Sequence, residues 1–290
     1  MLSIVLFCIL GIFIVHGCLY GYSLYINNRH QYDISFKNVI MASLCSIQAT
    51  FGTLIIYLLF ILRHLTHILN NYYIKNTYHT GLPKSTPLLF VHPALHNSGA
   101  WLIYLYYYIK HGYRNFYFFE YSCRESSLQS AGERLAGKID CIIEKHKDEG
   151  LIIIGASLGA LVARASLTRI TYPELVKGFI TLACPHSGTH LASAVPSIIF
   201  PLLHDIAYQG VGIQALEKSE KECQGAHFPR IAFASDMDEM VVPGCSLLPP
   251  KFTNQDWKMY HIASISHMNI MIHIPTIRRT LHEVAKLRIT

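Results

Sequence analysis

The chain has 290 residues, of which 51% are hydrophobic and 14% charged, and its formal net charge at pH 7 is +6. This composition is more apolar than that of an ordinary soluble domain, so it predicts a membrane-embedded part beside one large α/β domain. No run of Lys and Arg concentrates the positive charge, and the 17 His show no metal-ligand spacing. We therefore expect neither a nucleic-acid partner nor a metal site.

Two apolar stretches open the chain. Residues 2–26 contain no charged side chain, and residues 39–62 are interrupted only by a few Ser, Thr and Gln. Each stretch is long enough to cross a bilayer at about 1.5 Å per residue. We therefore predict an N-terminal membrane hairpin of two transmembrane helices over 1–69. A signal peptide or lipoprotein signal for the first stretch, and a buried amphipathic helix for the second, are the alternatives.

This hairpin predicts a multi-pass membrane protein. The segment after the second stretch carries one basic residue more than the short loop between the stretches. That margin favours a cytoplasmic position for the remaining domain without deciding it.

Beyond a polar linker at 70–86, strand-like and helix-like patterns alternate from residue 87 to residue 290. We predict strands at 88–91, 116–121, 151–154, 179–183, 231–234 and 259–263, and helices at 98–110, 128–145, 158–170 and 275–286. This alternation predicts an α/β fold in which a mostly parallel sheet has helices on both faces.

An insertion at about 191–227 interrupts the alternation of strands and helices. We interpret it as a cap over an acyl-binding site, with an ordinary core helix and a loop as the alternative. The eight cysteines are scattered without a C-x-x-C pair, which excludes a disulfide framework and leaves open only a Cys223–Cys245 bridge.

The sequence LIIIGASLGAL at 151–161 carries the strongest chemical signal. Gly-x-Ser-x-Gly between a buried strand and a helix is the signature of a nucleophile elbow, which presents Ser157 at the start of the helix. An oxyanion hole needs two backbone N–H groups. We assign one to Leu158 and the other to Ala94, because Pro93 in the loop after the first core strand has no N–H.

A serine nucleophile needs a histidine base, and the base needs an orienting carboxylate. The acid follows a late strand in this chain order, where three carboxylates are available and remain open from the residues alone: Asp236, Asp238 and Glu239. The base follows the last strand. His261 falls within that strand and His273 at the start of the next helix, so we favour His267 in the loop between them.

With these residues in view, the chain resembles the lipase/esterase branch of the α/β-hydrolase superfamily, and bacterial triacylglycerol-lipase-like esterases in particular, some of which carry two N-terminal membrane spans. The stretches that carry the resemblance are LLFVHPALHNSGAW (88–101), IIIGASLGALVAR (152–164), FITLACPHSGTHLA (179–192), DEMVVP (238–243) and SHMNIMIHIPTI (266–277).

The resemblance implies an α/β-hydrolase fold, with Asp238 as the acid and His267 as the base, and a structural role for His186. It also implies a location in a bacterial inner membrane. One departure concerns the oxyanion loop, where His92-Pro93 replaces the usual His-Gly. Because proline fixes φ, this loop is expected to differ in shape.

The predicted function is therefore that of a membrane-anchored serine hydrolase, a lipase or esterase that cleaves lipidic or small acyl esters through an acyl-enzyme. No cofactor is implied, and the sequence does not indicate an oligomeric state. The alternatives are an acyltransferase or thioesterase on lipidic acyl groups, and a non-catalytic scaffold with this fold.

Overall fold

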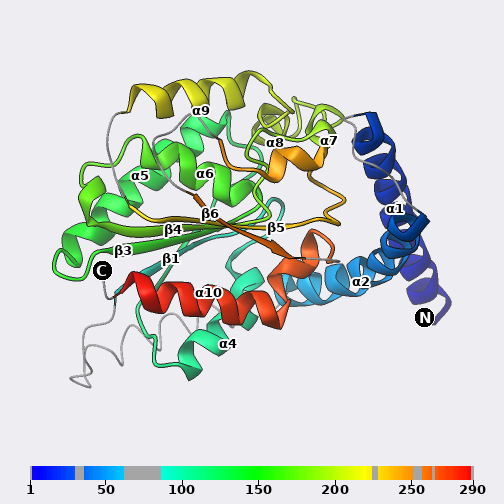
Figure 1. Cartoon of the computed structure of the whole chain (residues 1–290), viewed down its shortest axis with the longest axis horizontal. Coiled ribbons are helices and arrows are strands. Elements are labelled where there is room, and N and C mark those ends of the chain that lie inside the picture. Colours follow the sequence, from blue (N-terminus) through cyan, green and yellow to red (C-terminus); the bar gives the residue numbers. More distant parts are fainter. Residues whose placement is uncertain are drawn as a thin grey trace.

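The computed structural model describes residues 2–29, 36–61, 86–223, 228–250, 257–262 and 265–288. The predicted linker at 70–86 lies outside these residues except for Thr86. Within the described ranges, an N-terminal helical hairpin packs against an α/β domain (Figure 1).

The centre of the domain is a parallel sheet with the strand order β2-β1-β3-β4-β5-β6. Every neighbouring pair of these strands is parallel. The strands are β1 (Leu88–Val91), β2 (Phe116–Phe119), β3 (Leu151–Ala156), β4 (Val176–Leu182), β5 (Arg230–Ser235) and β6 (Trp257–Ile262). Their positions agree with the predicted alternation, and the carboxyl ends of parallel strands meet at one edge of the sheet.

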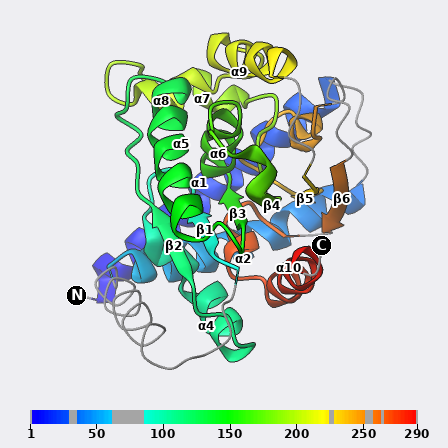
Figure 2. The ribbon, with the colours of Figure 1, turned by 90° about the vertical axis from the view of Figure 1, so that its left-hand side faces the viewer.

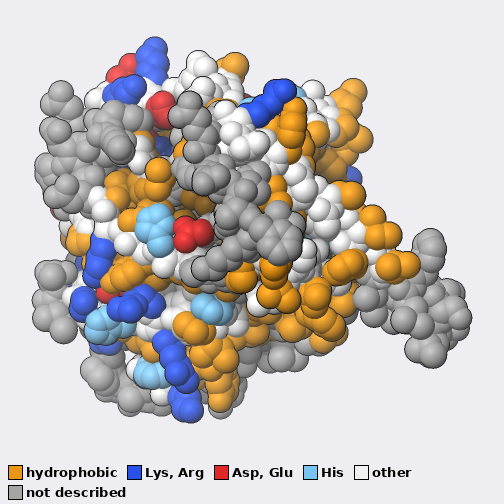
Figure 3. Space-filling view, turned by 45° about the vertical axis from the view of Figure 1, so that its right-hand side comes forward, with side chains coloured by type: hydrophobic (Ala, Val, Ile, Leu, Met, Phe, Trp, Pro, Cys, Tyr) orange, Lys and Arg blue, Asp and Glu red, His pale blue; other side chains and the backbone are white. Residues whose placement is uncertain are grey.

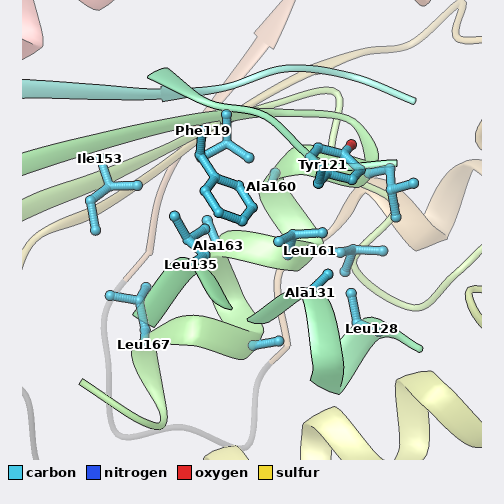
Figure 4. Packing of buried hydrophobic residues seen from close by; sticks show 14 of the residues in the cluster. Phe119, Tyr121, Leu128, Ala131, Leu135, Ile153, Ala160, Leu161, Ala163 and Leu167 are labelled. Atoms are coloured by element: carbon cyan, nitrogen blue, oxygen red, sulfur yellow. The ribbon is translucent and has the colours of Figure 1, made fainter. Parts of the chain in front are cut away.

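Helices cover both faces of the sheet because successive side chains of a strand point to opposite faces. Leu89 and Ile153 pack on the face of α5 (Leu128–Lys145) and α6 (Leu158–Leu167), and Figure 4 shows this packing. Their neighbours Phe90 and Ile154 pack on the face of α4 (Leu102–Lys110) and α10 (Ile274–Leu287). Figure 2 shows the two layers along the sheet. This arrangement is the predicted α/β fold.

Local sequence explains the starts of two of these helices. The Ser127 side chain accepts a hydrogen bond from the backbone N–H of Ser130 and so caps α5. Pro275 lies in the first turn of α10, where its missing N–H costs no intrahelical hydrogen bond.

The insertion between β4 and β5 contains α7 (His190–Ser193), α8 (Pro201–Asp205) and α9 (Val211–Glu222). Leu202, Ile213 and Leu216 are buried in the same core as α5 and α6. Asp205 accepts a hydrogen bond from the backbone N–H of Leu128, over 2.8 Å, which ties α8 to the start of α5. These contacts join the insertion to the α5 and α6 side of the core. Cys223, just after α9, and Cys245 are both free thiols.

The N-terminal hairpin consists of α1 (Leu2–Arg29) and α2 (Phe36–Ile61), which pack against each other. His16 of α1 lies 3.1 Å from the hydroxyl of Thr53 on α2. By length and composition, the one described helix able to cross a membrane is α1, over Leu10–Arg29, while the apolar run of α2 covers only Ser43–Ile55. The predicted pair of transmembrane helices is therefore not confirmed. The hairpin instead packs on loops that follow β5 and β6, at the carboxyl edge of the sheet.

Candidate active site

Ser157 occupies the sharp turn between β3 and α6. Its φ and ψ are 51° and −125°, a conformation that non-glycine residues rarely adopt. The backbone N–H of Ser157 donates to the carbonyl of Leu182 at the end of β4, over 2.8 Å. Strain of this kind persists only where the surroundings hold it, and it is typical of functional turns.

The two glycines of the motif are required by close backbone contacts. A Cβ at Gly155 would lie 2.6 Å from the Cα of Ala160 in α6. A Cβ at Gly159 would lie 2.3 Å from the carbonyl oxygen of His92, which follows β1. Gly159 therefore lets the start of α6 touch the loop after β1, and this contact brings the two segments predicted to supply oxyanion donors together.

His267 links the serine to a carboxylate. Its Nε2 lies 2.8 Å from Ser157 Oγ, and its Nδ1 lies 2.7 Å from Asp238 Oδ2. The second oxygen of Asp238 accepts backbone hydrogen bonds from Met240 and Val241, over 2.9 and 2.8 Å. Three hydrogen bonds, from His267, Met240 and Val241, therefore hold the carboxylate of Asp238 in one orientation. His267 and Asp238 are both about 95% buried.

The electrostatics of this chain favour a basic imidazole. Burial lowers the pKa of His267, but the charge of Asp238, the hydrogen bond to it and the charge of Glu239 outweigh burial, so the pKa is raised above its usual 6.5. An imidazole with a raised pKa is a stronger proton acceptor for a serine hydroxyl. The arrangement Ser157–His267–Asp238 can therefore activate the hydroxyl for attack on a carbonyl carbon.

The part of the chain that contains Ser157 is similar to a known protein family. Residues 121–219, about a third of the chain, match a family described as "Putative serine esterase" (DUF676). The chain has the α/β-hydrolase fold, and this third of it resembles a serine esterase family. Among curated protein sequences, none matches the chain.

Solved structures share the fold of this α/β-hydrolase at low sequence identity. Lipase B of Aspergillus fumigatus is 15% identical with a TM-score of 0.60, and the match covers 71% of this chain but 53% of that one. The chain therefore spans about half the length of that lipase. A mature lipase of Bacillus licheniformis is 16% identical (TM-score 0.52, covering 70% and 94% of the two chains). The monoacylglycerol lipase of Paleococcus ferrophilus is 17% identical (TM-score 0.51, covering 70% of this chain and 96% of that one).

The structure distinguishes the three carboxylates that the sequence left open. Asp236 is exposed, and its Oδ1 lies 3.3 Å from Nδ1 of His261 rather than near His267. Glu239 is fully buried and accepts a hydrogen bond from the backbone N–H of His267, over 2.9 Å. Burial and the charge of Asp238 raise the pKa of Glu239 to about 7. Asp238 alone of the three contacts the imidazole of His267.

The other histidines of interest have structural partners. His273 occupies the residue position before α10, and its Nδ1 lies 2.8 Å from the hydroxyl of Thr276. His186 is buried, and its backbone carbonyl accepts a hydrogen bond from Arg164. Among the described residues, no group of three or more His, Cys, Asp or Glu side chains is arranged to hold a metal ion.

The predicted oxyanion donors lie on two chain segments that come into contact at Gly159. Leu158 is the first residue of α6, where backbone N–H groups have no partner within the helix. Ala94 lies in the loop after β1, whose start is fixed by His92. The ring of His92 stacks on Tyr121 with centroids 4.4 Å apart, and the Tyr121 hydroxyl donates to the His92 carbonyl over 2.9 Å. This contact holds the loop despite Pro93.

Sequence reasoning missed that the hairpin of this α/β-hydrolase contacts the loop of the acid. On α1, the Tyr20 hydroxyl donates to the carbonyl of Met237 over 3.1 Å, and Asn27 accepts from the N–H of Gly244 over 2.8 Å. The Ser23 hydroxyl lies 3.5 Å from the carbonyl oxygen of Asp238 itself. The signal was a polar stripe at positions 16, 20, 23 and 27, whose spacing places all four on one face of an otherwise apolar helix.

The second helix of the hairpin contacts the loop of the base. Asn269 lies in the 3-10 turn η4 (Met268–Met271) that follows His267 directly, and its amide nitrogen lies 3.5 Å from Gln48 Oε1. Close approach at this point depends on Gly52, because a Cβ there would meet the Asn269 side chain at 2.0 Å. The hairpin therefore packs against both loops that carry partners of Ser157.

Proposed function

We propose that this α/β-hydrolase is a membrane-attached enzyme that cleaves carboxylic esters through an acyl-enzyme intermediate. The observation that carries the proposal is the hydrogen-bonded chain from Ser157 Oγ through His267 to Asp238. All three side chains lie at the carboxyl edge of the sheet, and the serine is the least buried of them.

In the proposed reaction, Ser157 Oγ attacks the carbonyl carbon of the ester while Nε2 of His267 takes the hydroxyl proton. Asp238 holds the imidazole by Nδ1 and stabilises its positive charge. The tetrahedral intermediate collapses as His267 returns the proton to the leaving alcohol, which leaves the acyl group on Ser157. Water, deprotonated by the same imidazole, then releases the acid.

The negative charge of the intermediate is assigned to the backbone N–H groups of Leu158 and Ala94. The N-terminus of α6 supports this assignment, because unpaired N–H groups and the helix dipole favour an anion there. The contact between Gly159 and the carbonyl of His92 keeps the two donor segments adjacent.

Membrane attachment is assigned to the hairpin, whose outer side chains are apolar and exposed. Examples are Ile14 of α1 and Phe51 of α2, with 55% and 61% of their surfaces accessible. Because the polar stripe of α1 is bonded to the loop of Asp238, we place the hairpin along the membrane surface rather than across it. A lipidic acyl ester is the substrate class that fits an active site at this position.

The proposal is tested with purified full-length protein, p-nitrophenyl esters of increasing acyl length and a fluorophosphonate probe. The wild type should hydrolyse the esters and form a covalent adduct on Ser157. Ser157→Ala should lose both, with turnover reduced by at least about 10⁴-fold. Ser193→Ala, an exposed serine on α7, is the matched control and should change neither.

Two other outcomes separate the competing functions. A wild type that forms no adduct would contradict catalysis and favour a binding scaffold. An acyl-enzyme formed from a p-nitrophenyl ester, with release of p-nitrophenolate, whose acyl group passes to an added alcohol or amine faster than to water would identify an acyltransferase.

A further inference from the structure

A cationic pocket of about 640 Å³ lies between α4 and α10, away from Ser157. Lys110 and His111 border it from α4 and the residue after it, and Arg278, His282 and Arg288 border it from α10 and its C-terminal cap. None of the described residues that line the pocket is acidic. A pocket with this lining attracts a phosphate or another anion.

The basic character extends over the exposed side of α10. Its exposed residues include Arg279 and Lys286 in addition to Arg278 and His282. The one acidic residue of this helix, Glu283, is buried, and it is bonded to Lys258 and Tyr260 over 2.9 and 2.8 Å. It also pairs with Lys286 over 3.6 Å, so the basic surface rests chiefly on the arginines and on Lys110. The exposed surface of α10 is therefore cationic along about 20 Å.

An apolar groove of about 650 Å³ begins where α10 begins. Ile47, Phe51 and Ile55 line it from α2, and Ile274 and Pro275 line it from the first turn of α10. Along α2, the exposed apolar residues Leu44, Ile47, Phe51, Ile55 and Leu58 are spaced as one helical stripe. Figure 3 shows hydrophobic side chains over the hairpin beside Lys, Arg and His side chains over α10.

We infer that the α2 stripe, the apolar groove and the basic side of α10 form one docking face for a membrane rich in anionic lipids. The apolar stripe enters the interface, and Lys110, Arg278 and Arg288 bind lipid phosphate groups. Charge complementarity selects this partner, because an apolar stripe continuous with a cationic surface matches lipid chains below anionic headgroups.

This inference rests on the proposed function for its biological meaning, since docking on this face would hold the hairpin, and with it the loops of Asp238 and His267, against the lipid. The docking itself does not require catalysis. It is therefore measured on the Ser157→Ala chain, so that failure to bind lipid and failure to hydrolyse esters are separate results.

The experiment is sedimentation of the full-length chain with vesicles of phosphatidylcholine, with or without about one third phosphatidylglycerol. We expect the anionic vesicles to bind at least about tenfold more strongly, and the preference to fall as NaCl rises from about 0.05 to about 0.5 M. Lys110→Gln/Arg278→Gln should reduce binding to anionic vesicles about tenfold or more, because each lost charge near the surface weakens binding about fivefold.

Lys138→Gln/Lys145→Gln on α5, which covers the opposite side of the sheet, is the matched control and should bind as the parent does. Phe51→Gln should weaken binding to both vesicle types, since it removes apolar contact rather than charge. Equal binding to neutral and anionic vesicles would overturn the inference. Equal losses of binding in Lys110→Gln/Arg278→Gln and in the α5 control would do the same. A chain that binds no vesicle but self-associates, and loses this self-association with Phe51→Gln, would show that the face binds a second copy instead.

In the Ser157 wild-type background, Lys110→Gln/Arg278→Gln should leave the hydrolysis of a soluble short-chain ester unchanged. If the wild type hydrolyses that ester but shows no anionic preference, the docking face is wrong and the proposed function stands. If it binds anionic vesicles without hydrolysing any ester, the proposed function is wrong and the docking face stands.

Discussion

Glu239 accepts a hydrogen bond from the backbone N–H of His267, over 2.9 Å, although its neighbour Asp238 is the residue that contacts the imidazole. The other oxygen of Glu239 lies 3.7 Å from Nδ1 of His16 on α1. A buried carboxylate thus connects the main chain of the proposed base with the hairpin. Glu239 is in this view a positioning residue, and its charge also acts on His267.

The first prediction concerns the pH dependence of hydrolysis. His267 must be neutral to accept the proton of Ser157, and Glu239 contributes to raising its pKa. Glu239→Gln keeps an acceptor for the His267 N–H but removes the charge, so the pKa of His267 falls. The acidic limb of kcat/KM should move to lower pH by up to about one unit, with kcat above pH 8 retained within about threefold. Glu222→Gln, an exposed glutamate on α9, should leave the profile in place; an unmoved limb in both variants would show that Glu239 has no electrostatic role.

The second prediction concerns stability, because the pKa of Glu239 is raised to about 7 in the folded chain. A raised carboxyl pKa means that folding favours the protonated form. The contribution is complete below the unfolded value of about 4.3 and is lost as pH rises through 7. Glu239→Gln removes this dependence. The difference in free energy of unfolding, variant minus wild type, should therefore become more positive from pH 5 to pH 8, by at most about 3 kcal/mol. Urea unfolding at the two pH values measures the difference, and a relative loss at pH 8 would contradict the assignment.

The third prediction concerns Gly159. An added Cβ would meet the carbonyl oxygens of His92 and Val91 at 2.3 and 2.5 Å, and neither backbone segment has a flexible end that can move away. Gly159→Ala should therefore destabilise the chain by about 1–3 kcal/mol and reduce kcat, since it separates the segments that carry Leu158 and Ala94. Gly137→Ala is the matched control: this exposed glycine of α5 has open space at its Cβ. The free energy of unfolding of Gly137→Ala should rise by about 0.5–1 kcal/mol, because alanine has a higher helix propensity than glycine. Equal effects of the two substitutions would show that the close contact at Gly159 is unimportant.

Much of the fold was predictable because its signals are local. The predicted helix at 128–145 has the same bounds in the structure, since its cap Ser127 and its apolar periodicity are both encoded within the segment. The same holds for Ser157, whose small flanking residues mark the turn.

What the sequence could not decide depends on tertiary placement. Three carboxylates stand within four residues at Asp236, Asp238 and Glu239, and only the position of the His267 loop assigns each its partner. The apolar helices α1 and α2 satisfied a length criterion for membrane spans. Their inner contacts with Met237 and Asn269 join segments more than 200 residues apart, which no local pattern reveals.

The last prediction concerns Arg164, which is fully buried on the helix that begins at the nucleophile. Its guanidinium donates to both oxygens of Glu220 on α9, over 3.0 and 2.6 Å, and to the carbonyl of His186 over 2.8 Å. Arg164→Met leaves a nearly buried Glu220 without its partner, so it should cost about 3–5 kcal/mol of unfolding free energy. Because the loss comes from the stranded charge, Arg164→Met/Glu220→Leu should recover most of it.

Helix α9, which carries Glu220, also offers an exposed pair for comparison. The charged atoms of Lys218 and Glu222 are 3.9 Å apart. Lys218→Met should cost no more than about 0.5 kcal/mol, because exposed pairs one helical turn apart contribute little. Thermal and urea unfolding of these three variants, each compared with the wild type, form the test. If Arg164→Met costs as little as Lys218→Met, the buried pair does not fasten α9 to α6. If the double variant is no more stable than Arg164→Met, the loss comes instead from the hydrogen bond to His186, and the P-H-x-G-T segment depends on it.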